Sequence, residues 1–195
     1  MIIGIDEVGR GAWAGSMLFC AVTLSNSIDG LADSKKLSKK QRQQLASQIK
    51  KSAKYIGYGW VTASEIDDYG LTKASKLACQ RALKNAPRNA KILIDGKINF
   101  LQLSYDESDS LQYEVECVVG GDGVVAEISA ASIVAKVTRD EYMAEQAKIY
   151  PFYGFERNVG YGTKKHLDSI KEFGLSPLHR LSYKPLKDIL NTYEA

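Results

Sequence analysis

The residues of this sequence that could do chemistry are four acids placed after short apolar runs or inside a glycine-rich turn. Asp6 and Glu7 directly follow the apolar residues 1–5, Asp95 follows a second apolar run, and Asp122 lies between glycines. Carboxylates near a protein core are costly to bury and repel one another, and a divalent cation offsets both effects. Oxygen ligands with no His or Cys beside them suit Mg²⁺ or Mn²⁺ better than zinc. The alternative is that each acid forms a separate salt bridge.

The elements that must position these acids alternate along the chain. Apolar and β-branched residues predict five strands, at residues 1–5, 17–24, 55–63, 91–96 and 111–119. Helical spacing and capping residues predict helices at residues 38–51, from residue 64, at residues 72–85 and at residues 127–148. The pattern favours an α/β fold with a mixed sheet covered on both faces, in which ligands collect at the carboxyl ends of strands. Residues 151–195 contain short helical pieces separated by Gly and Pro, so we expect a small helical lobe after a main domain at residues 1–150.

The adjacent acids Asp6 and Glu7 place a condition on the first strand. Neighbouring side chains on a regular strand point to opposite faces of the sheet, so these two converge only if the strand ends or bulges between them. Gly4 and Gly9, on either side, would allow such an irregularity. We therefore expect the strand to end or to bulge at the acids.

The charged residues are distributed unevenly, although the formal net charge is only +3. Residues 34–54 contain eight Lys or Arg and no acid, and residues 157–187 contain seven Lys or Arg against two acids. Basic segments around an acidic centre indicate a polyanionic partner at the rim and cations in the middle. For residues 34–54 the alternative is a solvated helix surface.

Length and composition exclude several classes of protein. With 195 residues, 45% of them hydrophobic and 25% charged, the chain has the proportions of an ordinary globular domain rather than a disordered protein. Its apolar stretches are far shorter than the roughly 20 residues of a membrane-spanning helix. Acids among the first residues argue against a signal peptide, so we expect a cytoplasmic protein with no membrane partner. The three cysteines are scattered and indicate neither a zinc site nor redox chemistry.

An ordered set of motifs resembles ribonuclease HII. The motifs lie at residues 3–11, 33–37, 94–96, 121–122, 128–140 and 160–166, followed by His179 and Arg180. Each piece alone is weak, but together they occur in family order over nearly the whole chain. Two departures stand out: the family often has prolines where residues 12–16 stand, and often a lysine at the position of Gly120. Neither departure touches an acid.

The resemblance implies an RNase H-like mixed sheet flanked by helices, with a small C-terminal helical lobe. It implies an endonuclease that cleaves the RNA strand of RNA/DNA hybrids and nicks duplex DNA on the 5′ side of an embedded ribonucleotide. Asp6, Glu7, Asp95 and Asp122 would bind two divalent ions. One ion would activate a water and the other would stabilise the departing 3′ oxygen, leaving 5′-phosphate and 3′-hydroxyl ends.

The resemblance also implies residues that contact the substrate. The Gly-Arg-Gly segment (Gly9, Arg10 and Gly11) would read the ribose 2′-hydroxyl with its main chain, and Tyr161 would pack on a neighbouring sugar. From composition alone, the segment is a turn between strands and Tyr161 an anchored loop aromatic. Lys35 and Lys36 would either contact phosphates or face solvent.

Other polar residues receive structural interpretations. We expect His166 and His179 to have structural or phosphate-contacting roles rather than to shuttle protons, because a two-metal reaction needs no histidine. Asp67 is expected at the surface, and Arg139 is expected to pair with the adjacent acids Asp140 and Glu141.

Three classes of function compete. The leading hypothesis is a metal-dependent ribonuclease that binds RNA/DNA hybrids and ribonucleotide-containing duplex DNA and acts as a monomer. The second is a hybrid-binding module without catalysis, which would not need the complete set of acids. The third is a ribonuclease H limited to long hybrids, against which the Gly-Arg-Gly segment and Tyr161 argue together.

Overall fold

The five strands form one mixed sheet in the computed structural model, which describes residues 1–31, 37–102 and 113–193. The strands are β1 (Ile2–Val8), β2 (Met17–Leu24), β3 (Ala53–Val61), β4 (Lys91–Asp95) and β5 (Glu114–Val118), in the order β3-β2-β1-β4-β5. β1 pairs antiparallel with β2, and β2 antiparallel with β3, whereas β1–β4 and β4–β5 are parallel pairs. The predicted mixed α/β sheet is confirmed.

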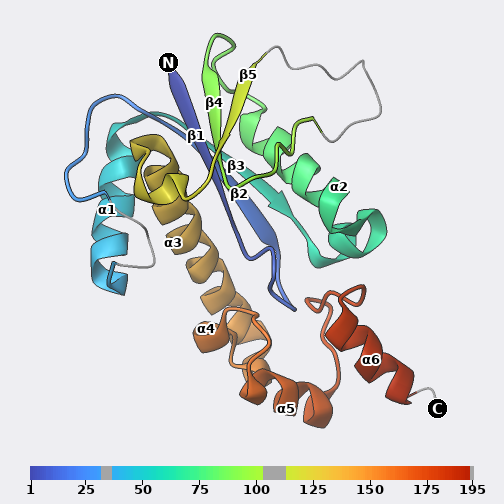
Figure 1. The fold of residues 1–195 in the computed structure, drawn as a ribbon. Helices are drawn as coiled ribbons and strands as arrows, with labels where there is room; N and C mark the ends of the chain where they lie inside the picture. Colours follow the sequence, from blue (N-terminus) through green and yellow to red (C-terminus); the bar gives the residue numbers. More distant parts are fainter. Residues whose placement is uncertain (32–36, 103–112, 194–195) are drawn as a thin grey trace.

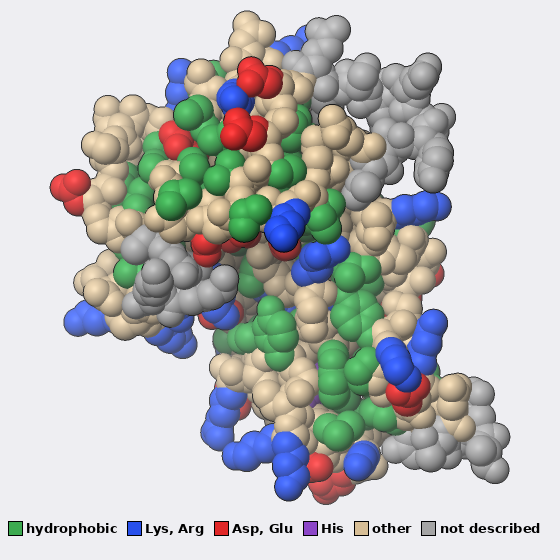
Figure 2. Space-filling model, in the orientation of Figure 1, with side chains coloured by type: hydrophobic (Ala, Val, Ile, Leu, Met, Phe, Trp, Pro, Cys, Tyr) green, Lys and Arg blue, Asp and Glu red, His purple; other side chains and the backbone are tan. Residues whose placement is uncertain are grey.

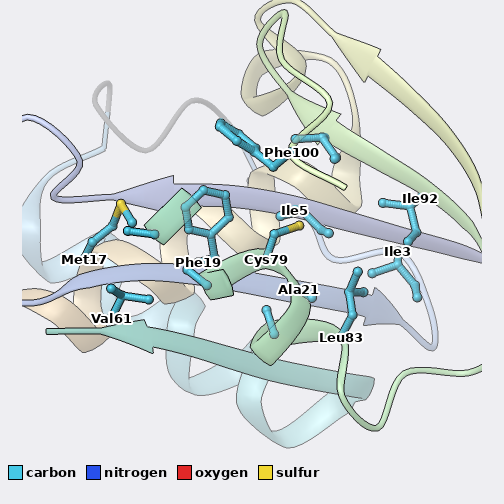
Figure 3. Close-up of a cluster of buried hydrophobic side chains, with 14 of the residues drawn as sticks. Ile3, Ile5, Met17, Phe19, Ala21, Val61, Cys79, Leu83, Ile92 and Phe100 are labelled. Atoms are coloured by element: carbon cyan, nitrogen blue, oxygen red, sulfur yellow. The ribbon is translucent and has the colours of Figure 1, made fainter. Parts of the chain in front are cut away.

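Three helices cover this sheet: α1 (Lys39–Ser52), α2 (Ala63–Leu83) and α3 (Ala126–Ile149). α1 and α3 lie on one face and α2 on the other (Figure 1). Side chains of β2 alternate between the two faces of the sheet and contribute to the hydrophobic core on each face. Phe19 packs with α2, whereas Leu18 and Cys20 pack with α1 and α3. Figure 3 shows the α2 layer, where Ile3 of β1 lies beside its register partner Ile92 of β4 in the same cluster as Phe19.

Helix boundaries follow local signals in the sequence. The expected cap at Ser38 is confirmed, since its hydroxyl accepts from the Gln41 N–H and the Gln41 side chain accepts from the Ser38 N–H. The two helices predicted from residue 64 and at residues 72–85 correspond to the two parts of α2, which are separated by a kink at Gly70, where the φ of 76° is not helical. In the main part of the fold, the short 3-10 helix η2 (Gly121–Gly123) leads into α3.

The strand that carries Asp6 and Glu7 is longer than expected. β1 continues to Val8, and its register with β2 is unbroken, with Asp6 opposite Cys20 and Glu7 opposite Phe19. The expectation that the strand ends or bulges at the acids was therefore wrong, because pairing with β2 keeps the backbone extended beyond the last contact with β4. As a result, the two acids point to opposite faces of the sheet.

Close backbone contact fixes α3 against β1. A Cβ built on Gly4 would lie 2.1 Å from the backbone carbon of Glu127, so only glycine lets the start of α3 rest directly on the strand. This approach brings the α3 side chains that follow, including Ser132, toward the acids at the end of β1.

After α3, the chain forms a small group of helices: η3 (Pro151–Tyr153), α4 (Phe155–Asn158), α5 (Lys164–Phe173) and α6 (Lys184–Tyr193). They lie at the end of α3, away from most of the sheet (Figure 1). Their buried side chains, such as Phe155 and Ile170, pack with Ala14 and Met143 from the preceding part of the chain. The division at residue 150 stays a prediction. In the described ranges, no helix is long and apolar enough to cross a bilayer.

Candidate active site

A pocket of about 350 Å³ opens where β1 extends past the end of β4. It collects seven of the predicted site residues: Asp6, Glu7, Gly9, Arg10, Gly11, Asp95 and Tyr161. Val8, Arg42, Ser132 and Lys136 complete its lining. We call it the acidic pocket. Lys35 and Lys36 lie outside the described residues.

The Asp6 carboxyl has a strongly raised pKa. Burial raises its pKa to about 7, the charges of Glu7 and Asp95 add to this rise, and a hydrogen bond from Ser132 opposes it. The Glu7 N–H donates to the Asp6 carboxylate at 2.7 Å. Glu7 itself faces α2, where burial first and the Glu7 charge second raise the pKa of the Cys79 thiol to about 12. Both acids still line the acidic pocket, because β4 no longer pairs with β1 beside them, although β2 does.

Asp95 ends β4 beside Asp6. The parallel register pairs Ile5 with Ile94, so the next residues, Asp6 and Asp95, follow on the same face of the sheet. The Gly121 N–H donates to the Asp95 carboxylate at 2.8 Å and so orients it. This hydrogen bond links the end of β4 to the turn that carries the fourth acid.

Asp122 is placed differently from the other three acids. It lies in η2, is buried, and its carbonyl accepts from the Ser129 hydroxyl, but it does not line the acidic pocket. Within the described ranges, no three or more Asp, Glu, His or Cys side chains are arranged so that they could hold a metal ion. The assignment of four metal ligands therefore stays a prediction.

The chemistry of the donors nevertheless suits a hard divalent cation. The acidic pocket offers carboxylate oxygens and the Ser132 hydroxyl, and it contains neither His nor Cys. Magnesium and manganese prefer such oxygen ligands. A cation would also offset the repulsion among Asp6, Glu7 and Asp95 that contributes to the raised pKa of Asp6.

The Gly-Arg-Gly segment forms the wall of the acidic pocket next to the acids. Gly9 has a φ of 80°, and a Cβ there would lie 2.0 Å from Nε of Arg139, so the position requires glycine. A Cβ on Gly11 would meet no atom within 4 Å, which leaves open space beside its backbone. Arg10 stacks its guanidinium on Phe100 at 5.5 Å, and its buried Nε has no hydrogen-bond partner.

Two buried arginines hold this segment from behind. Arg180 donates to the carbonyls of Gly15 and Arg10, and burial lowers its pKa. Arg139 donates to the carbonyls of Ala14, Ser16 and Val159, and burial lowers its pKa to about 10. The predicted pairing of Arg139 with its neighbouring acids was wrong.

Asp140 and Asp67 each bind a partner that the sequence did not indicate. Asp140 pairs with Lys136 at 2.7 Å, one helical turn earlier. Asp67, expected to be an ordinary surface acid, accepts from the backbone N–H groups of Leu181 and Ser182 and from the Ser182 hydroxyl. It therefore fastens the segment after Arg180 to α2.

Tyr161 is the site residue contributed by the C-terminal helices. Its ring is partly exposed and lies 6.0 Å from the Arg139 guanidinium. Its backbone neighbour Gly160 accepts hydrogen bonds from Trp13 and Ala14, so the Tyr161 turn docks directly after the Gly-Arg-Gly segment. His166 and His179 are buried behind this turn, which agrees with a structural role and leaves them out of reach of a phosphate.

Sequence reasoning missed three side chains of the acidic pocket. Ser132 and Lys136 lie one turn apart on α3, and Arg42 comes from α1. The i, i+4 spacing of Ser132 and Lys136 on a helix that runs beside the acids was the available signal. Arg42 and Lys136 also line a second cavity, of about 470 Å³, that reaches Arg157. More Lys and Arg side chains gather over α4 and α5 of the C-terminal helices (Figure 2).

The mixed sheet with flanking helices is an RNase H-like fold, and the acidic pocket at its edge offers the oxygen ligands that a metal-dependent nuclease would use. The family model described as Ribonuclease HII matches residues 3–186. The chain belongs to the ribonuclease HII family, and it is a metal-dependent endoribonuclease that acts on RNA/DNA hybrids.

Individual relatives agree with this assignment. A ribonuclease HII from Dichelobacter nodosus is 42% identical over an alignment that covers 97% of each chain. Ribonuclease H2 from Pyrococcus horikoshii OT3 has a TM-score of 0.76 at 24% identity, covering 99% of this chain and 98% of its own. RNase HIII (Bst) in complex with Mn²⁺ has a TM-score of 0.73 at 21% identity, covering 98% of this chain and 69% of its own. The two structural likenesses bear on the fold alone.

Proposed function

We propose that this enzyme cleaves the RNA strand of RNA/DNA hybrids and also nicks duplex DNA on the 5′ side of a single embedded ribonucleotide. Asp6, Glu7, Asp95 and Asp122 would hold two Mg²⁺ or Mn²⁺ ions, and the products would carry 5′-phosphate and 3′-hydroxyl ends. The observation that carries the proposal is that one pocket joins three of these acids to the Gly-Arg-Gly segment and Tyr161. A nuclease limited to long hybrids would not need these two elements together.

The enzyme's own groups divide the work of binding and orientation. Ser132 and the Gly121 N–H orient the carboxylates of Asp6 and Asp95. Arg42 and Lys136 place cations at the rim of the acidic pocket, where they would attract phosphates. When bound, the divalent ions supply the charge that activates a water and stabilises the leaving oxygen.

Recognition of the ribonucleotide would use the open backbone beside Gly11. A ribose 2′-hydroxyl both donates and accepts hydrogen bonds, so main-chain amides and carbonyls can distinguish it from deoxyribose. The Tyr161 ring, partly exposed on the other side of the acidic pocket, would pack on the adjacent sugar. We further propose that the enzyme acts as a monomer, since a single chain suffices to bring the acids, the Gly-Arg-Gly segment and Tyr161 into one pocket.

The experiment that tests the proposal is cleavage of a DNA duplex that contains one ribonucleotide. We expect a single cut on its 5′ side with Mg²⁺ or Mn²⁺, and no cut with EDTA. The matched substrate without the ribonucleotide should stay intact. Cleavage of a long hybrid without cleavage of the single-ribonucleotide duplex would refute the proposed specificity.

The role of Tyr161 can be tested with the same two substrates. A single ribonucleotide offers one productive register, whereas a long hybrid offers many, so loss of alignment should cost more on the first. Tyr161→Ala should therefore lower kcat/KM on the single-ribonucleotide duplex more than on the hybrid. Equal losses on both substrates would mean that Tyr161 only supports its loop.

A further inference from the structure

The two histidines of the chain form a buried hydrogen-bonded pair that the proposed reaction does not use. Nε2 of His166 lies 3.1 Å from Nε2 of His179. The rings of Tyr153 and Phe155 pack against both imidazoles, and Trp13 packs against His166. A hydrogen bond between two imidazole nitrogens requires that one carries a hydrogen and the other a lone pair.

The partners of the two Nδ1 atoms decide which is which. The Ser176 backbone N–H, which can only donate, points to Nδ1 of His179 at 2.9 Å, whereas the Ser176 carbonyl is more distant at 3.3 Å. The Ser176 hydroxyl is also 2.9 Å from this nitrogen, and because its oxygen already accepts from the Leu178 N–H, its own hydrogen is free to donate to Nδ1. Nδ1 of His166 lies 2.9 Å from the Tyr161 carbonyl, which can only accept. His179 is therefore protonated on Nε2 and His166 on Nδ1, and every hydrogen bond runs in one direction.

We propose that His166 and His179 are positioning residues, which hold Tyr161 in place for ribonucleotide recognition through a directed relay from Ser176 through His179 and His166 to the Tyr161 carbonyl. This inference rests on the proposed function of Tyr161. The far end of the relay is anchored beside the Gly-Arg-Gly segment, because Ala14 forms a β-bridge with His179 and the Arg180 N–H donates to the Trp13 carbonyl. The relay thus ties the residue that would pack on the sugar to the segment that would read its neighbour.

Burial supports a relay of neutral rings. Burial lowers the pKa of His166, and burial together with the neighbouring His166 lowers the pKa of His179 to about 4. A proton added to Nε2 of His166 would face the Nε2–H of His179 and remove the acceptor on which the relay depends.

The direct test is the tautomeric state of each ring in the unmodified protein. With two histidines in the chain, imidazole ¹⁵N NMR at pH 7.5 gives one pattern for each residue. We expect a hydrogen on Nδ1 of His166 and on Nε2 of His179. The opposite tautomer of either ring would overturn the relay, whatever the activity of any variant.

The functional test compares two replacements of His166. His166→Phe keeps a ring but has no donor, and it should lower kcat/KM on the single-ribonucleotide duplex about three- to tenfold, with a smaller loss on the long hybrid. His166→Asn places an amide N–H where Nδ1–H stood and should recover most of the loss. Ser169→Ala, on the same helix, removes a hydroxyl that donates to the Lys165 carbonyl and serves as the matched control.

Coupling to Tyr161 separates this inference from the proposed function. In a Tyr161→Ala background, His166→Phe should cost nothing further on the single-ribonucleotide duplex. Equal losses on both substrates, additive losses in the double variant, or failure of a folded His166→Asn variant to recover would each overturn the positioning role. Should Tyr161→Ala itself show no selectivity, the proposed function of Tyr161 fails, and the NMR tautomers still decide whether the relay exists.

Discussion

Replacement of Asp6 by asparagine should make the metal-free enzyme more stable above neutral pH. The folded protein raises the pKa of Asp6 from 3.8 to about 7, mainly through burial. Between these two values the folded state binds a proton that the unfolded state has released, so the stability of the parent falls as pH rises through this window. Asparagine carries no charge and escapes this cost.

The size of the effect follows from the two pKa values. One pKa unit is worth about 1.4 kcal/mol, so a rise from 3.8 to about 7 costs about 4 kcal/mol once both states are ionised. Because Asp6 opens into the acidic pocket, entry of water reduces this figure, and we expect about 2 to 4 kcal/mol at pH 8. At pH 4 the difference between parent and variant should shrink to about 0.5 kcal/mol.

Urea unfolding in EDTA, at pH values from 4 to 8, measures this difference directly. Asp68→Asn, an exposed acid on α2, is the control and should change stability little at any pH. A variant that is less stable than the parent at pH 8, or a difference that does not depend on pH, would refute the view that Asp6 is held at an electrostatic cost.

Three further predictions concern the acidic pocket and its support. Asp95→Asn removes ligand charge from an acidic cluster, so it should lower turnover with Mg²⁺ at least about a hundredfold while hybrid binding in EDTA is kept or tightened. Turnover within about tenfold of the parent would exclude Asp95 from the reaction. Arg42→Gln should reduce the slope of log affinity for a hybrid against log salt concentration by about 0.9, the contribution of one phosphate contact. The control Arg88→Gln, on an exposed turn that does not line the acidic pocket, should leave the slope unchanged. Equal slopes in the two variants would contradict a phosphate contact at Arg42. Arg180→Met should lower the free energy of unfolding by about 3 kcal/mol, since buried carbonyls lose their donors. The control Arg157→Met, at an exposed position, should lower it by less than about 0.5 kcal/mol. Similar thermal stability of the two variants would contradict the view that Arg180 supports the Gly-Arg-Gly segment.

The elements that depend on neighbours along the chain could be predicted from the sequence. The strand at residues 17–24, the cap at Ser38 and the interruption between the helices after residue 64 all depend on local sequence, and the structure has each of them. The end of β1 could not be predicted in this way. The polar pair after residue 5 resembles a strand end, but distant β2 supplies the pairing that extends the strand to Val8.

The candidate site divides in the same manner. The acids and the Gly-Arg-Gly segment stand out through residue type and through their resemblance to a family. Side-chain partners that depend on the tertiary fold do not stand out in the sequence. Arg42 therefore has no local signal that places it in the acidic pocket. Arg139 is predicted to pair with an adjacent acid, whereas it donates to three carbonyls that lie 20 or more residues away. For Asp122, the sequence predicts the turn in which it lies but not its position relative to the acidic pocket.

The double hold on the Arg10 carbonyl has a consequence for the order in which the enzyme becomes complete during its synthesis. The carbonyl accepts from Arg180, 170 residues later in the chain, and from Tyr183, 173 residues later. Contacts between such distant residues form late, because a long loop must close before they are made. A ribosome-bound chain could thus have its sheet in place while the wall beside its acids still lacks support. The nascent nuclease would then acquire its recognition surface only after the Arg180 segment has emerged and docked.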